Sequence, residues 1–99
     1  MIKQITSENF DEKIKESCVI DFYAEWCGPC RMLTPILESI SSEIKTKKFY
    51  SIDIDQNVFI AEKYNIKTIP TILVFEKGEI IKRIIGFKHR DDLTKELTN

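Results

Sequence analysis

The chain has 99 residues, of which 42% are hydrophobic, and carries a formal net charge of -1. This length predicts one domain over residues 1–99, and the apolar fraction excludes a disordered chain. The near-neutral charge gives no reason to expect a nucleic acid or a membrane as partner. The lack of an apolar run near ~20 residues and of a secretory signal predicts a cytoplasmic protein.

The first half of the sequence alternates predicted strands and helices. We expect a short strand over residues 2–5, a helix from Thr6 or Ser7 to about Lys15, and a buried strand over residues 18–24. A long helix follows that strand, because apolar residues recur there at helical spacing. The residues of this stripe are Leu33, Ile36, Leu37, Ile40 and Ile44.

The second half ends in a predicted hairpin and a helix. Residues 49–54 read as a strand, 57–64 as a short helix, 71–75 and 80–85 as two strands, and 91–97 as a closing helix. The order βαβαβαββα predicts an α/β fold with a central five-stranded mixed β-sheet flanked by four α-helices. Its early strands are parallel, and its last two are antiparallel.

Two cysteines stand where the predicted central strand passes into the long helix. Cys27 and Cys30 are separated by Gly28 and Pro29. Free N–H groups and the positive dipole end of a helix N-terminus favour a thiolate at Cys27. Cys30 lies one helical turn further on, so it can attack a mixed disulfide formed by Cys27. The pattern predicts thiol–disulfide exchange.

Asp21 interrupts the otherwise apolar central strand, six residues before Cys27. A buried carboxyl resists ionisation, and a base of raised pKa suits deprotonation of the less exposed Cys30. We therefore prefer a proton acceptor over an aspartate that only bonds to the backbone. Ile69-Pro70 precedes the next-to-last strand, where the proline either begins the strand or forms a cis bond beside the site.

The main alternative for the cysteine pair is a zinc half-site. Zinc takes four ligands, and beyond the pair the chain offers only Cys18 and His89, at spacings that do not fit, so we expect no metal. We expect Cys18 to pack in the core and His89 to lie at the surface or cap a helix. Phe59 either packs in the core or is exposed and binds a partner.

Together these residues resemble the thioredoxin family. The segment from Val19 to Met32, with the motif Trp26-Cys27-Gly28-Pro29-Cys30, resembles its active-site block. The match continues along nearly the whole chain in the right order. It includes Pro35, residues 53–57 and 64–71, Gly78 and Gly86.

The resemblance implies a thioredoxin fold and a protein-disulfide reductase that carries electrons in cell redox homeostasis. Cys27 would be the nucleophile, Cys30 the resolving thiol that closes a Cys27–Cys30 disulfide, and Asp21 the buried acid. The residues implied to bind substrate are Trp26, Gly28, Pro29, Ile69, Pro70 and Gly86.

The family also implies partners and an electron source. No cofactor would be bound, and electrons would come from NADPH through a thioredoxin reductase. Clients would be disulfide-containing proteins such as peroxiredoxin, methionine sulfoxide reductase or ribonucleotide reductase, and the chain would be a monomer.

Three residue departures and two alternatives accompany the resemblance. Tyr23 stands where many members have tryptophan, Arg31 where lysine is common, and Ser51 where some members carry a lysine near the buried acid. A disulfide oxidase or isomerase is one alternative, although Gly28-Pro29 favours a reductant. A thioredoxin-like binding subunit with dispensable thiols is the other.

Overall fold

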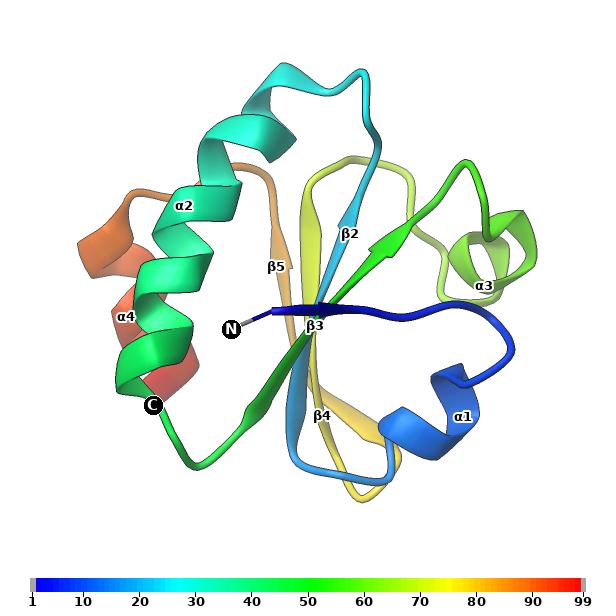
Figure 1. Ribbon diagram of the computed structural model, residues 1–99, viewed down its shortest axis with the longest axis horizontal. Helices are drawn as coiled ribbons and strands as arrows, with labels where there is room; N and C mark the ends of the chain where they lie inside the picture. The colour runs from blue at the N-terminus through cyan, green and yellow to red at the C-terminus, as the bar shows by residue number, and fades with distance from the viewer. Residues whose placement is uncertain (1, 99) are drawn as a thin grey trace.

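A computed structural model describes residues 2–98, which form one five-stranded sheet with helices on both faces (Figure 1). The strands are β1 (Lys3–Gln4), β2 (Cys18–Tyr23), β3 (Lys48–Asp53), β4 (Thr71–Glu76) and β5 (Glu79–Ile85). The helices are α1 (Phe10–Lys13), α2 (Gly28–Glu43), α3 (Val58–Lys63) and α4 (Arg90–Thr98). No helix within these residues is long and apolar enough to cross a membrane.

The strand order is β1-β3-β2-β4-β5. Strands β1, β2 and β3 are parallel, whereas β4 runs antiparallel to both β2 and β5. The predicted mixed sheet, its closing hairpin and the order of its elements are confirmed. The central strand β2 has neighbours on both sides, and its Asp21 stands opposite Ser51 of β3 and Ile72 of β4.

Two apolar cores lie on opposite faces of the sheet, since side chains alternate along each strand. Figure 1 shows α2 and α4 on one side of the sheet and α1 and α3 on the other. Val19 packs in the core that α2 and α4 cover, while Ile20 and Phe22 pack in the other core. Asp21 shares the face of Val19, so the fold directs its carboxyl toward α2.

The first helix is shorter than the sequence predicts. The predicted segment began at Thr6 or Ser7 and ended at about Lys15, whereas α1 covers only Phe10–Lys13. Side chains hold the preceding residues in turns: the Thr6 N–H donates to Asn9 Oδ1 at 2.9 Å, and the Glu8 N–H donates to Thr6 Oγ1 at 3.2 Å. Such local hydrogen bonds compete with a helical backbone.

The other elements agree with the predicted ones to within two residues at each end. In α2, Leu33, Leu37 and Ile40 are buried, and Ile36 and Ile44 pack partly buried against the same core. The predicted stripe therefore attaches α2 to the sheet. This packing fixes the first turn of α2 at the carboxyl end of β2, where the cysteines lie.

Candidate active site

The two cysteines lie at the N-terminus of α2 and form a disulfide, with 5.3 Å between their Cα atoms. Cys27 is the residue that caps the helix, and its extended backbone turns its sulfur back over the first turn. The Cys30 N–H donates to Cys27 Sγ at 3.2 Å. Pro29 stands in the first turn, where its missing N–H needs no partner. The predicted placement of both sulfurs is confirmed.

The surroundings of Cys27 suit a thiolate in the reduced chain. The first turn of α2 contains no acidic residue, so no carboxylate opposes the positive end of the helix dipole. An N–H that already faces Cys27 Sγ would become a charge-assisted donor to a thiolate. Both cysteines are buried, so the N-cap position and the N–H donor, rather than exposure, favour the charged form at Cys27 over Cys30.

A cis peptide bond between Ile69 and Pro70 lies beside the disulfide. The Ile69 carbonyl oxygen is 3.9 Å from Cys27 Sγ, and Ile69 packs against the buried cluster of Ala24, Cys27 and Cys30. The Pro70 carbonyl accepts a hydrogen bond from the Gly86 N–H at 2.8 Å. Gly86 has φ +87°, which only glycine adopts without strain. The structure thus decides the proline question that the sequence left open.

The surface around the disulfide carries an exposed aromatic ring. Trp26 is 67% exposed, and its indole N–H donates to Asp55 Oδ2 at 2.8 Å. Pro29 is also exposed, and Gly28 is half-buried. Sequence reasoning assigned no role to Asp55. It follows β3, and because the carboxyl ends of parallel strands meet at one sheet edge, its nearness to the cysteines could have been inferred.

Asp21 is 4% exposed, and within residues 2–98 its Oδ1 has no hydrogen-bond partner. Burial raises the pKa of this carboxyl from 3.8 to about 7. A carboxyl of this kind can hold or release a proton near neutral pH. The predicted burial of Asp21 is therefore confirmed.

Asp21 and Cys30 line the same pocket, which has a volume of about 250 Å³. We call it the Asp21 pocket. Tyr23 also lines it, and the phenol of Tyr23 accepts a hydrogen bond from the Gln4 amide. The family resemblance places Ser51 near Asp21, but the other polar side chains of this pocket were not found from the sequence, because only the packing of the β2–α2 loop and α2 beside Asp21 brings them there. They are Glu25, Arg31, Thr34 and Glu38.

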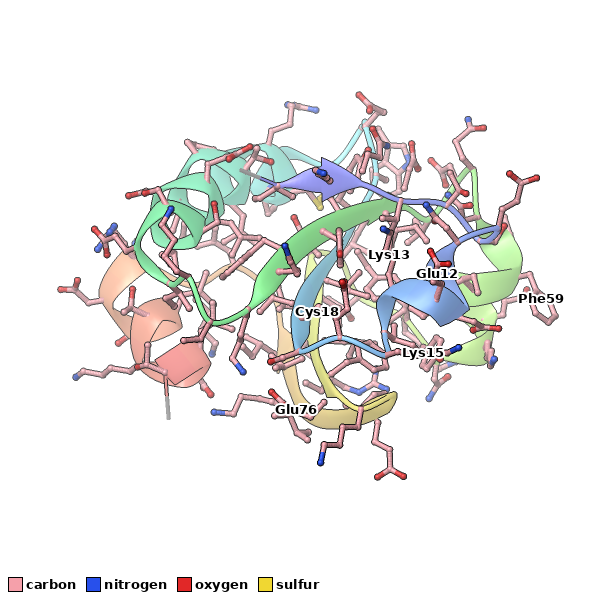
Figure 2. All side chains as sticks on the ribbon, turned by 60° about the horizontal axis from the view of Figure 1, so that its bottom comes forward. Glu12, Lys13, Lys15, Cys18, Phe59 and Glu76 are labelled. Carbon is pink, nitrogen blue, oxygen red and sulfur yellow. A yellow bond between two sulfur atoms is a disulfide. The ribbon has the colours of Figure 1, made fainter. Side chains whose placement is uncertain are left out.

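Three other residues considered from the sequence lie away from this constellation. Cys18 is a fully buried free thiol, as expected, and burial first and the nearby Glu16 second raise its pKa to about 12. His89 is exposed beside the ring of Phe87. Phe59 is 73% exposed and projects from α3, so it is not a core residue (Figure 2). Within residues 2–98, no three His, Cys, Asp or Glu side chains cluster as metal ligands would.

Known proteins similar to this chain are thioredoxins. The family model Thioredoxin matches residues 1–99. Thioredoxin of Chlamydia pneumoniae is 47% identical over 95 residues, which cover 95% of this chain and 93% of the relative. Thioredoxin of Staphylococcus haemolyticus is 37% identical, with 97% of this chain and 94% of the relative covered.

Solved structures agree with the sequence relatives. A chain from a structural study of thiol resolution in yeast mitochondrial 1-Cys peroxiredoxin, through the glutathione and thioredoxin systems, superposes with a TM-score of 0.87. It is 33% identical, and 95% of this chain and 91% of that chain are covered. A mutant thioredoxin from Halobacterium salinarum gives a TM-score of 0.86 at 29% identity, with 94% and 84% covered.

Proposed function

The chain belongs to the thioredoxin family of thiol–disulfide oxidoreductases, and on that premise we propose that it is a protein-disulfide reductase and electron carrier. The observation that supports this most directly is the position of Cys27. Its sulfur lies at the N-terminus of α2 and accepts the Cys30 N–H, which favours a reactive thiolate within reach of a second thiol. Residues 1–99 act as one thioredoxin domain.

Catalysis begins when the Cys27 thiolate attacks one sulfur of a client disulfide. A Cys27–client disulfide forms, and the other client sulfur leaves as a thiolate. The Cys30 N–H and the helix dipole stabilise the charge on Cys27 before the attack. Cys27 reacts first because its sulfur, and not that of Cys30, lies at the N-cap of α2 and accepts the Cys30 N–H.

Resolution then needs a thiolate at Cys30. The Asp21 carboxylate takes the Cys30 proton, the Cys30 thiolate attacks Cys27 Sγ, and the Cys27–client bond breaks. The products are the Cys27–Cys30 disulfide and a client thiolate, so the client gains the two electrons that the dithiol loses. A pKa of about 7 at Asp21 suits this exchange, because the carboxyl can accept and release the proton at neutral pH.

Clients bind on a docking surface around the disulfide. We define it by the residues Trp26, Gly28, Pro29, Ile69, Pro70 and Gly86. The exposed Trp26 ring offers apolar area, and its bond to Asp55 orients that ring. Cis Pro70 and Ile69 present backbone beside Cys27, where an extended client segment can lie. Positioning of the client disulfide against Cys27 follows from this arrangement.

The oxidised chain is returned to the dithiol by NADPH-derived electrons through a thioredoxin reductase. The chain itself binds no cofactor in this cycle, since sulfur chemistry alone carries the two electrons. Its clients are protein disulfides, including those of enzymes such as peroxiredoxins, methionine sulfoxide reductases and ribonucleotide reductases. It works in the cytoplasm as a monomer.

Trapping of clients tests this function. Immobilised Cys30→Ser protein should accumulate mixed disulfides through Cys27, because the resolving thiol is missing. Immobilised Cys27→Ser protein is the matched control, since it keeps Cys30 and the buried Cys18 but lacks the nucleophile. Equal capture by the two variants, or none by Cys30→Ser, would contradict the proposal.

The direction of electron flow needs a second measurement. A reductase should have a low redox potential, well below the value of about -180 mV typical of disulfide isomerases. A potential at that higher value would favour the isomerase. Undiminished partner activity of a Cys27→Ser/Cys30→Ser double variant would instead indicate a binding subunit.

A further inference from the structure

The Asp21 pocket is separate from the docking surface on which clients bind. It lies beside Cys30, and none of the six residues of the docking surface lines it. Its lining includes Glu25, Arg31 and Thr34, which are exposed, so the pocket reaches the protein surface. Asp21 therefore has a second approach from solvent, separate from the surface on which the client lies.

We infer that the Asp21 pocket is a proton port, through which Asp21 passes the Cys30 proton to solvent while a client covers the docking surface. Ser51 and Thr34 act as positioning residues that keep this port polar and open. The inference rests on the proposed function, in which Asp21 deprotonates Cys30.

The Asp21 carboxyl is buried without a hydrogen-bond partner for one of its oxygens, Oδ1, among residues 2–98. A buried carboxyl oxygen without a partner is costly unless water reaches it. The pocket of about 250 Å³ that Asp21 lines is large enough for several water molecules, each of which needs about 30 Å³.

Hydroxyl side chains from two elements line the walls of the pocket. Ser51 stands directly opposite Asp21 on β3, and its short hydroxyl side chain leaves space where a longer one would fill it. Thr34, one turn after Cys30 on α2, donates to the Cys30 carbonyl at 3.1 Å. Hydroxyl groups on both sides can hold a chain of water between the carboxyl and the surface.

The charges around the port are mixed. Ile72 of β4, opposite Asp21 in the sheet, is apolar, and Ser51 of β3 is uncharged, so neither neighbouring strand places a charge at the carboxyl. The titratable and charged groups that line the pocket besides Asp21 are Tyr23, Glu25, Cys30, Arg31 and Glu38. The carboxylates Glu25 and Glu38 at its wall can accept a proton from water on the way out.

Two proton transfers accompany resolution, and they take place on different faces of the site. During resolution one proton moves from Cys30 to Asp21 and then through the pocket to bulk water. The client thiolate leaves on the docking surface and takes its own proton from solvent there. Because the two protons use different faces, Asp21 can be deprotonated before the client departs.

Filling the pocket tests the inference without changing Asp21, Cys30 or the docking surface. Thr34→Leu adds apolar volume from an exposed position of α2, and Ser51→Val does so from β3. Ser42→Leu is the matched control, because Ser42 is an exposed hydroxyl residue of the same helix outside the pocket. Circular dichroism checks that each variant is folded.

Two rates are read by stopped flow, from the fluorescence of the single tryptophan, Trp26, next to Cys27. Attack is followed in the Cys30→Ser background, and resolution in the dithiol protein at saturating client. We expect both pocket variants to slow resolution at neutral pH about tenfold and to move its pH midpoint upward by about one pH unit. The attack rate and the Ser42→Leu profile should stay within about twofold of the parent.

A second readout is the titration of Asp21 by ¹³C NMR of its carboxyl carbon, which should move upward with the resolution midpoint. Unchanged resolution and an unchanged titration in folded Thr34→Leu and Ser51→Val would overturn the proton port. Asp21→Asn separates the two proposals: if it leaves resolution unaffected, the assignment of Asp21 as proton acceptor fails. If it slows resolution and the pocket variants do not, only the port fails.

Discussion

Replacing Asp21 by asparagine should make the protein's stability much less sensitive to pH. The pKa of Asp21 is about 7 in the folded chain, against 3.8 for an ordinary aspartate, because burial penalises the charged form. Between these values the unfolded chain gives up the proton and the folded chain keeps it. The free energy of unfolding therefore falls as pH rises through this window, and the loss is complete above about pH 7.

The size of the effect follows from the two pKa values. A pKa of about 7 in place of 3.8 corresponds to about 4 kcal/mol at roughly 1.4 kcal/mol per pH unit. The stability of Asp21→Asn relative to the parent should rise by about this amount between about pH 4 and pH 8. For a chain of this size, 1 kcal/mol moves the melting temperature by roughly 4–8 °C, so the change is large.

Equilibrium urea unfolding of the disulfide form, at a series of pH values, measures the difference. Any constant effect of the new amide cancels, because only the pH dependence of the difference between the two proteins is used. Asp91→Asn, at an exposed position of α4, controls for removing one surface charge. A parent-minus-variant difference that stays constant from about pH 4 to pH 8 would refute a raised pKa at Asp21.

Three further outcomes are expected. Phe10→Ala should cost about 3–5 kcal/mol in urea unfolding, because the ring is fully buried and lies against Phe22 and Phe75; a cost below about 1 kcal/mol would contradict this packing. Cys18 should resist iodoacetamide in the folded chain and react in urea, since its thiol is buried and its pKa is about 12. Mass spectrometry follows the labelling, and rapid labelling of the folded chain would show that the thiol is accessible. Gly78→Ala should lower stability by about 1 kcal/mol, because Gly78 has φ +85° in the β4–β5 turn; an unchanged urea midpoint would count against strain there.

The sequence by itself determined the order of elements, the two-sided burial of β2 and the chemistry of the cysteine pair. These features are local. Apolar runs and helical spacing predict the elements, and a Cys-Gly-Pro-Cys segment at a strand-to-helix junction places one sulfur at a helix N-terminus. The burial of Asp21 could also be predicted, because its neighbours on the strand are apolar on both faces.

Only the tertiary structure decided the features that join distant segments. The cis bond at Pro70, the contact of Ile69 with Cys27, the bond from Trp26 to Asp55 and the exposure of Phe59 were beyond the sequence. The same holds for the short α1, where side-chain hydrogen bonds of Thr6 and Asn9 displace the first helical turn. In each case the conformation is stabilised by interactions between groups that the fold brings together. A sequence pattern indicates only how residues close along the chain interact. The Asp21 pocket also depends on the tertiary structure, since β2, β3 and α2 meet around the carboxyl. The sequence predicts that this carboxyl is buried, but it does not show which side chains surround it.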